Sequence, residues 1–307
     1  MKHFISLKDF TAKEINDLLE FASEFKRFPL KNPSLLEGRT LAMLFTKPSN
    51  RTRVSFEVGA KELGAHTLFL GPQEVQMGKR ETVEDISRVL SRYVHGIVFR
   101  TFDHEDIVRF AKVSSVPVIN GLSDLLHPCQ ILADLLTIKE HKGKIKDTKI
   151  VYLGDGNNVL NSWIYASNLL SLDFVYSTPK AYQPPSFILE EAQTLEGAKE
   201  ANIRYEEDPL KAVLDADIVY TDVWISMGEK GKNESREDIF LPYQINESLL
   251  KKANPQALVM HCLPANRGME VDEFVLDGPQ SIIFDQAENR LHAQKAILQK
   301  LFEINKK

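Results

Sequence analysis

Short apolar runs alternate with longer segments of helical spacing along the first half of the chain. Residues 11–14 form a capping box, and the apolar positions after it, at 15, 18, 19, 22 and 25, lie on one face of a predicted helix. Runs rich in β-branched and aromatic residues follow at 40–45, 67–70, 96–101 and 116–120. This alternation predicts βαβ units that build a parallel sheet.

The second half of the chain repeats the alternation. A helix is expected at 128–141, because Pro128 suits a first helical turn and Gly143 suits a helix end. Further strands are expected at 149–153, 174–177, 218–221, 257–260 and 281–284. We therefore expect an α/β fold of two doubly wound parallel-sheet domains, 1–140 and 141–307, connected by the 128–141 helix. A last helix at about 287–304 is expected to return to the first domain, and the polar segment 229–238 is expected to form a loop that closes over a substrate.

Composition and charge narrow the class of protein. The 307 residues suffice for two cores, and 43% hydrophobic with 26% charged residues is typical of a soluble globular protein. The net charge of −5 gives no general attraction to nucleic acid or to anionic membranes, so neither is expected as a partner. The start of the chain lacks the apolar segment of a secretory signal, and 2 cysteines cannot staple a secreted fold of this size. A cytoplasmic enzyme is the expectation.

The residues directly after the strands carry most of the candidate chemistry, because ligands of open parallel sheets bind at the carboxyl ends of the strands. Ser49 is a natural N-cap for the helix after 40–45, and the free N–H groups, the Ser49 and Thr52 hydroxyls and the guanidiniums of Arg51 and Arg53 would converge on one point. That arrangement suits a phosphate dianion. The alternative is a capped helix with two solvated arginines.

Two further segments of the first half carry polar groups at strand ends. Arg100 follows 96–99 and is expected either to point at the same crevice or to form a surface ion pair. His127 and Gln130 open the 128–141 helix, where an imidazole and an amide can polarise a carbonyl and hold an amide group. A histidine with a purely structural capping role is the alternative.

Segment 154–158, Gly-Asp-Gly-Asn-Asn, raises the possibility of dinucleotide binding by an NAD-dependent oxidoreductase. The fingerprint is incomplete, because Val159 and Leu160 fill the region of the third glycine and no ribose-binding acid follows the next strand. The Asn157 and Asn158 side chains are alternatively suited to a carboxylate or an ammonium group.

Asp222 follows the 218–221 strand, where it suits a ligand ammonium group or, alternatively, caps a turn. A zinc site built from His127, Cys129, His261 and Cys262 is disfavoured, because neighbouring strand residues point to opposite faces and neither pair has zinc-finger spacing. Cys262 as a small buried hydrophobic residue is the ordinary alternative to a chemical role.

Seven segments taken together carry a resemblance: 49–57, Arg100, 127–130, 154–158, 222–228, 261–264 and 288–290. In this order and at these spacings they resemble the aspartate/ornithine carbamoyltransferase family over essentially the whole chain, and its ornithine-using members most closely. The resemblance implies transfer of the carbamoyl group of carbamoyl phosphate to the δ-amine of L-ornithine, giving L-citrulline and phosphate, in either the biosynthesis or the breakdown of arginine. It implies no metal and no organic cofactor.

The resemblance also implies site residues. Those for carbamoyl phosphate are Ser49, Asn50, Arg51, Thr52, Gln76, Arg100, His127, Gln130, Cys262, Leu263 and Arg290. Those for ornithine are Asn158, Asp222, Ser226 and Met227, and the catalytic residues are Arg100, His127, Asp222 and Cys262. Gln76 would reach the site of a neighbouring subunit, so the implied assembly is a homotrimer or a multiple of trimers.

Specificity is implied by the residues for the second substrate. Aspartate-using members of the family carry a proline where Cys262 stands and lack the 226–228 motif, and putrescine has no α-carboxylate. The sequence departs from the family at Asn50, which replaces a threonine, and at Asn266 and Met269, which replace a histidine and a glutamate. The alternatives are a carbamoyltransferase for another amine, such as putrescine or an acylated ornithine, and a non-catalytic sensor of a phosphate ligand.

Overall fold

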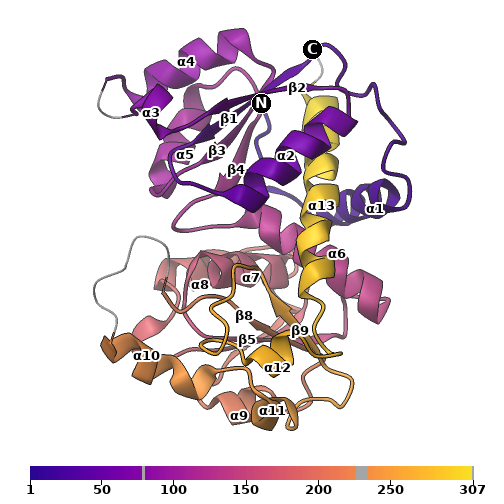
Figure 1. Cartoon of the computed structure of the whole chain (residues 1–307), viewed down its shortest axis with the longest axis vertical. Coiled ribbons are helices and arrows are strands. Elements are labelled where there is room, and N and C mark those ends of the chain that lie inside the picture. The colour runs from indigo at the N-terminus through magenta and orange to yellow at the C-terminus, as the bar shows by residue number, and fades with distance from the viewer. Residues whose placement is uncertain (78–79, 226–233, 306–307) are drawn as a thin grey trace. The chain divides into compact units, whose positions relative to one another are not determined.

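A computed structural model describes residues 1–77, 80–225 and 234–305. The chain forms two compact units (Figure 1): unit 1 consists of Met1–Leu136 and Glu288–Lys307, and unit 2 consists of Thr137–Ala287. The chain passes from one unit to the other within the helices α6 (Pro128–Lys142) and α13 (Ile283–Ile304). The C-terminal part of α13 thus belongs to unit 1, as expected from the sequence.

The sheet of unit 1 has four parallel strands in the order β2-β1-β3-β4. Their bounds are Thr40–Phe45 for β1, His66–Leu70 for β2, Gly96–Arg100 for β3 and Val118–Leu122 for β4. The two central strands are buried from Leu41 to Phe45 and from Gly96 to Arg100, because helices cover both faces of a doubly wound sheet. The edge strand β2 is only partly buried.

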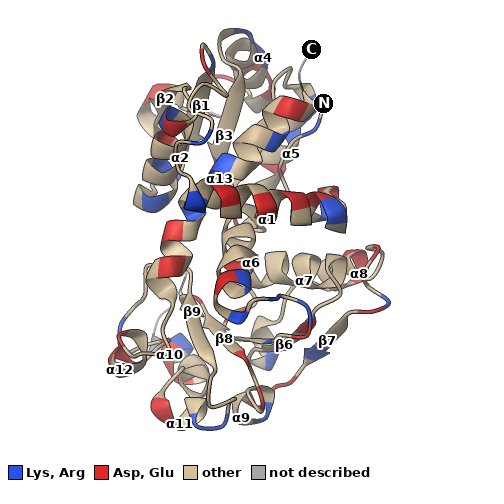
Figure 2. Cartoon of the chain, turned by 90° about the vertical axis from the view of Figure 1, so that its right-hand side faces the viewer, with Lys and Arg blue, Asp and Glu red and all other residues tan. Residues whose placement is uncertain are grey.

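The helices of unit 1 begin at local signals that the sequence contains. Thr11 caps α1 (Ala12–Arg27) through a capping box with Glu14, and the predicted stripe of α1 is buried. Charged residues lie along the exposed side of α1 (Figure 2). The other helices of unit 1, besides α6 and α13, are η1 (Leu7–Asp9), α2 (Asn50–Glu62), α3 (Pro72–Val75), α4 (Val83–Tyr93) and α5 (His104–Val113).

The sheet of unit 2 has five parallel strands in the order β7-β6-β5-β8-β9. Their bounds are Lys149–Leu153 for β5, Asp173–Ser177 for β6, Asn202–Tyr205 for β7, Ile218–Thr221 for β8 and Leu258–His261 for β9. The helices are α7 (Asn158–Leu169), η2 (Lys180–Tyr182), α8 (Ser186–Ala192), α9 (Pro209–Ala212), α10 (Glu234–Phe240), η3 (Leu241–Tyr243), α11 (Glu247–Leu250) and α12 (Glu273–Leu276).

The structure confirms the fold class and corrects three local expectations. The expected strand at 281–284 is the start of α13, with a single bridge from Ser281 to Val259, because so short an apolar run does not distinguish a buried strand from a helix start. Strand β7 was not expected, since its exposed Asn202 and Arg204 interrupt any apolar run at this sheet edge. Residues 234–238, expected as loop, begin α10, and 229–233 lie outside the described residues.

A helix that crosses a bilayer needs about 20 consecutive, predominantly apolar residues. None in the described part of the chain combines the length and the apolar character that crossing a membrane requires.

Candidate active site

The N-terminus of α2 in unit 1 is built for an anion. Ser49 has an extended backbone and its hydroxyl accepts a hydrogen bond from the Thr52 N–H at 3.3 Å, so α2 begins directly after the carboxyl end of β1. The first turn contains no acidic residue, and Asn50 and Arg51 are exposed there. An N-terminus without acidic side chains leaves the positive end of the helix dipole available to a ligand anion.

Arg53 does not join Arg51 at this point, contrary to the sequence-based expectation. Its Nε donates to Glu57 at 3.2 Å, one helical turn further on, and its guanidinium lies 3.8 Å from the centroid of the Phe69 ring. An i,i+4 carboxylate and an aromatic ring on the neighbouring strand therefore satisfy this arginine within the fold.

Arg290, at the other end of the chain, lies beside α2. Its guanidinium donates to Thr52 Oγ1 at 3.0 Å and to Gln130 Oε1 at 2.6 Å, and Gln130 in turn donates to Asp134 at 2.8 Å. All four side chains are buried. The structure thus brings together three predicted phosphate-site residues from α2, α6 and α13.

Arg100 and His127 lie in the same cationic environment of unit 1. Burial first, and the positive charges of Arg290 and Arg51 after it, lower the pKa of Arg100 to about 9. Burial and the cations Arg290, Arg100 and Lys47 hold the pKa of His127 well below its ordinary value of 6.5. The imidazole is therefore neutral near pH 7, and a bound anion would relieve the repulsion among these cations.

Lys47 is a member of this cluster that the residue-by-residue prediction did not include. It is 9% exposed, and its ammonium group lies 4.8 Å from the centroid of the Phe102 ring. The available signal was its position, directly after β1 and two residues before the Ser49 cap.

Gln76 ends α3 with a left-handed backbone at φ 45° and is exposed. It lines a cavity of about 500 Å³ together with Thr46, the residue that follows β1. The carboxamide of Gln76 donates to the Gln73 carbonyl at 3.2 Å. Gln76 thus lies on the surface of unit 1 near the end of β1, where another molecule can reach it.

Unit 2 carries a second cluster, centred on Asp222 at the carboxyl end of β8. The two carboxylate oxygens have separate donors: Asn157 Nδ2 lies 2.8 Å from Oδ2, and Cys262 Sγ lies 2.8 Å from Oδ1. These residues follow β5, β8 and β9, which are neighbours in the sheet. The parallel topology therefore brings together Asp222, a predicted ornithine-site residue, and Cys262, predicted as a catalytic residue and as a ligand of carbamoyl phosphate, with Asn157.

The two asparagines after β5 have different roles. Asn157 is the N-cap of α7, whereas Asn158 occupies the first turn with its side chain half-buried. The residues themselves suggested both asparagines as ligands of a carboxylate or an ammonium group, whereas the family resemblance assigned only Asn158 to ornithine. Ser226 and Met227, also assigned to ornithine, lie outside the described residues.

His261 and Glu270 support the turn that carries Cys262 and Leu263. His261 Nδ1 accepts from the Leu263 N–H at 2.8 Å, and His261 Nε2 donates to Glu270 at 3.1 Å. Glu270 also accepts from the Asn266 N–H at 2.5 Å, so the unusual residue at 266 contributes its backbone here. Both His261 and Glu270 are fully buried, and Glu270 is a supporting residue that the sequence reasoning did not single out.

The ligand atoms of Asp222, His261 and Cys262 all lie within 4.8 Å of one another, a spacing that fits a metal ion. Both ring nitrogens of His261 are already hydrogen-bonded, so a metal would have to displace one of these bonds. Cys129, a member of the zinc set considered from the sequence, is buried in unit 1 with its thiol donating to the Asn120 carbonyl at 3.3 Å. Burial raises the pKa of Cys129 to about 12, so it is a structural thiol.

The glycines of 154–158 serve the packing of the chain itself. A Cβ atom at Gly156 would lie 2.3 Å from the Tyr182 carbonyl oxygen, and the Gly156 N–H donates to that oxygen at 2.9 Å. Asp155 accepts from Arg236 at 2.6 Å. The close approach that a dinucleotide would need at Gly156 is thus occupied by the protein's own backbone, which disfavours the NAD-dependent alternative.

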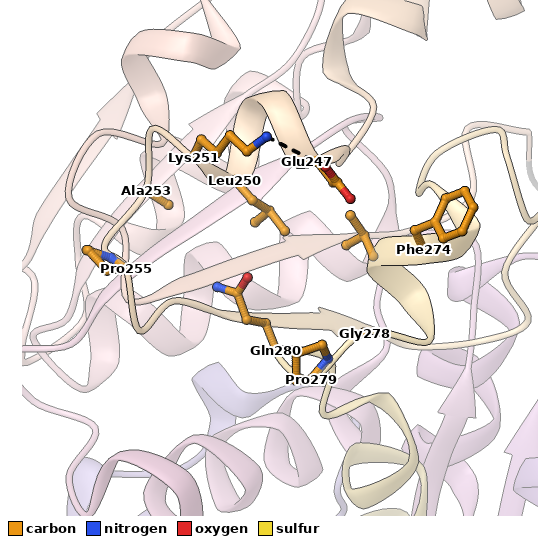
Figure 3. Close-up of a pocket in the computed structure, with 10 residues that line it drawn as sticks. Glu247, Leu250, Lys251, Ala253, Pro255, Phe274, Gly278, Pro279 and Gln280 are labelled. Atoms are coloured by element: carbon orange, nitrogen blue, oxygen red, sulfur yellow. Dashed lines mark ion pairs between the residues drawn. The ribbon is translucent and has the colours of Figure 1, made fainter.

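Figure 3 shows a different pocket of unit 2. It has a volume of about 430 Å³ and is lined by residues of α11, α12 and the chain around Gly278, with Glu247 and Lys251 paired at 3.6 Å on its rim. None of the predicted site residues lines it.

A helix N-terminus suited to an anion in one unit and an acid–amide–thiol cluster at strand ends in the other are features of a doubly wound α/β enzyme with two substrate-binding domains. The chain belongs to the aspartate/ornithine carbamoyltransferase family. The family's carbamoyl-P binding domain matches residues 2–140, and its Asp/Orn binding domain matches residues 146–301.

Relatives and solved structures agree with this family over nearly the full chain. The anabolic ornithine carbamoyltransferase of Pyrococcus furiosus is 51% identical over 299 residues, which cover 97% of this chain and 95% of that protein. A solved structure of ornithine carbamoyltransferase from the same organism matches with a TM-score of 0.93, covering 97% of this chain and 96% of that one. The anabolic enzyme from Campylobacter jejuni matches with a TM-score of 0.94 at 40% identity, covering 99% and 100%.

Proposed function

We propose that this protein transfers the carbamoyl group of carbamoyl phosphate to the δ-amine of L-ornithine, giving L-citrulline and phosphate. The observation that carries the proposal is the Asp222 carboxylate, held by Asn157 and Cys262 at the end of β8. A fixed negative charge there attracts an ammonium group of ornithine and repels the second carboxylate of aspartate.

Carbamoyl phosphate is assigned mainly to the proposed first domain, 1–140, together with Cys262, Leu263 and Arg290 from later in the chain. Support comes from the N-terminus of α2, which carries no acidic side chain, and from Arg100 and His127, whose pKa values are lowered first by burial and then by the neighbouring cations. The proposed ligands are Ser49, Asn50, Arg51, Thr52, Arg100, His127, Gln130 and Arg290, with Cys262 and Leu263 at the carbamoyl group. Ornithine is assigned to Asn158, Asp222, Ser226 and Met227 of the proposed second domain, 141–307.

The chemistry follows from these assignments. The lone pair of the neutral δ-amine attacks the carbamoyl carbon, and charge develops on the carbonyl oxygen, where Arg100, the Thr52 hydroxyl and neutral His127 stabilise it. The C–O bond then breaks and its electron pair leaves on phosphate, which Arg51 and the α2 N-terminus stabilise. The amine gives up one proton, which the departing phosphate accepts. Asp222 and Cys262 orient the amine, and no step requires a metal or an organic cofactor.

We further propose a role in arginine biosynthesis inside a reducing, cytoplasmic compartment. The relatives from P. furiosus and C. jejuni that are named anabolic support the direction. Neither Cys129 nor Cys262 forms a disulfide bond, which supports a reducing compartment.

The proposed assembly is a homotrimer or a multiple of trimers. Support comes from an exposed apolar patch on unit 1, formed by Val54 and Val58 on α2 and by Leu68 on the edge strand β2. These side chains are 49%, 40% and 42% exposed, and α2 and β2 pack against each other. An apolar patch beside an open strand edge is typical of a surface that another subunit covers. In this assembly Gln76 contacts carbamoyl phosphate in a neighbouring subunit.

One assay tests the function. Purified protein is mixed with carbamoyl phosphate and ornithine, aspartate, putrescine, lysine or acetylated ornithine, and the carbamoylated product is measured. Citrulline formation with the highest kcat/KM for ornithine is expected. A preference for putrescine or acetylated ornithine would show a carbamoyltransferase for another amine, and phosphate-ligand binding without any product would show a sensor.

A further inference from the structure

The orientation of the Asn157 side chain is fixed by groups that do not belong to any substrate. Its Oδ1 accepts from the Val159 N–H at 2.9 Å and from the Leu160 N–H at 3.3 Å, in the N-cap of α7. These two N–H groups can only donate, so the oxygen of the amide must face them. The Nδ2 group consequently faces Asp222, to which it donates at 2.8 Å.

The Tyr152 hydroxyl also holds the Asn157 side chain in place. Its hydroxyl lies 3.3 Å from Asn157 Oδ1 and 3.0 Å from the Asp155 carbonyl oxygen, so its proton is available to these two acceptors. The ring is fully buried and stacks on Tyr220 at 5.8 Å. Burial above all, and nearby Asp222 and Asp155 after it, raise the pKa of Tyr152 well above its ordinary value, so the hydroxyl remains a donor.

From these contacts we infer that Asn157, held by Tyr152 and by the start of α7, is a positioning residue that sets the orientation of the Asp222 carboxylate for the amine substrate. The inference rests on the proposed function. Asn157 donates to Oδ2 of Asp222 and Cys262 donates to Oδ1. The plane of the carboxylate is therefore defined by two donors that follow different strands. Asn157 contacts no substrate in this role; it acts through Asp222.

The variant Asn157→Asp separates this role from the capping role. An aspartate keeps the oxygen that caps α7, because Asp and Asn are both good N-caps. It replaces the Nδ2 donor by a second carboxylate oxygen facing Asp222. Keeping two carboxylates ionised at that distance is costly. In mild acid the two carboxylates share one proton, which restores the hydrogen bond. In alkali this proton is lost, and charge repulsion separates the two side chains.

Other titratable groups face this pair and must be considered. They are the Cys262 thiol, the Tyr152 hydroxyl, the Asp155 carboxylate with its partner Arg236, and the His261 imidazole, which has a ring nitrogen within 4.8 Å of an Asp222 carboxylate oxygen. All of them are shared by the wild type and the variant. The ratio of the two pH profiles therefore isolates the carboxylate introduced at 157.

The kinetic experiment measures citrulline formation for wild type and Asn157→Asp from pH 6 to pH 9. We expect the ornithine KM of the variant to rise on the order of 10-fold to 10²-fold at pH 9 and the defect to shrink toward pH 6, with the carbamoyl phosphate KM within a few-fold of wild type. Asn246→Asp is the matched control, because Asn246 caps α11 through the Leu249 N–H at 3.0 Å and its Nδ2 faces the neutral Gln244 amide. A defect that does not change with pH, or that affects both substrates equally, would overturn the inference.

A second measurement does not depend on the reaction. Urea unfolding should show that Asn157→Asp loses stability as pH rises. The double variant that combines Asn157→Asp with Asp222→Asn should restore the urea concentration at the midpoint of unfolding, because an amide again faces a carboxylate. No recovery in the exchange variant would contradict the contact. If the wild type forms no citrulline, the proposed function fails while this measurement still tests the pairing of the two residues.

Discussion

Arg290 and Thr52 are 238 positions apart in the sequence, yet their side chains form a buried hydrogen bond of 3.0 Å within one unit. The same guanidinium bonds Gln130, so one arginine near the end of the chain connects α2 and α6. Removing Arg290 would leave two buried acceptors without this donor, which costs about 1–3 kcal/mol for each unsatisfied group. A single side chain thereby couples the integrity of the fold to the arrangement of the proposed phosphate site.

Arg51 and Arg53 provide a matched pair of arginines for testing the phosphate site. Arg51→Ala should lower kcat/KM for carbamoyl phosphate by roughly 10²–10³-fold, because a charge-assisted contact to a poorly solvated phosphate is lost. Arg53→Ala should cost far less, since Arg53 is paired with Glu57 and stacked on Phe69. Steady-state kinetics on both variants measure these changes. Equal losses of kcat/KM for carbamoyl phosphate would contradict the assignment of Arg51 to the phosphate site.

The two cysteines test the amine site. Cys262→Ala removes a donor to Asp222, so we expect a higher ornithine KM and a lower kcat. The expected change is on the order of 10-fold to 10²-fold, the size of an effect that comes from misplacing a substrate. Carbamoyl phosphate affinity should stay within a few-fold. Cys129→Ala, at a buried position in α6, should instead lower the free energy of unfolding by about 1 kcal/mol with little kinetic change. Equal kinetic losses in both variants would indicate general packing damage.

The lowered pKa of His127 predicts that the free energy of unfolding depends on pH. Its pKa in the folded protein is well below 6.5, chiefly because of burial, so below about pH 6.5 the unfolded chain binds a proton that the folded state does not. The stabilising contribution is therefore present above this pH and is lost as pH falls, by up to about 1.4 kcal/mol per pH unit. Urea unfolding of His127→Gln between pH 6.5 and pH 5 should show a shallower loss than wild type. His66→Gln, at an exposed position on β2, is the control and should keep the wild-type slope.

The proposed sharing of sites between subunits predicts complementation. Gln76→Ala and Arg51→Ala subunits should each be nearly inactive alone, because every site in such a trimer lacks one proposed ligand. Mixed trimers should regain part of the activity, since some interfaces then combine an intact Gln76 with an intact Arg51. Activity after co-refolding of the two variants provides the measurement. Stable mixed trimers without recovery would indicate that each site is built within one chain.

The sequence alone determined the features that depend on neighbouring residues. The Ser49 cap joins residues three apart, and the capping box of α1 does the same, so both were visible as short motifs. The buried central strands β1 and β3 were equally visible, because a strand covered on both faces requires an uninterrupted apolar run. The expected strand at 281–284 was wrong for the complementary reason: three apolar residues in a short run fit the start of a buried helix as well as a strand.

Tertiary structure decided how the chemically active side chains are paired. Neither the Arg290–Thr52 bond nor the Asn157–Asp222–Cys262 cluster follows from local spacing, because each depends on which remote segments become neighbours. The strand order β5-β8-β9 places the carboxyl ends of three strands side by side. Only this arrangement brings Asn157, which follows β5, into hydrogen-bond distance of the Asp222 carboxylate, which follows β8. Arg53 illustrates the converse, since its partners Glu57 and Phe69 turn it away from a role that its sequence position suggested. Hydrogen bonds require donors and acceptors within about 3 Å, a condition that the folded chain meets and the linear pattern does not specify.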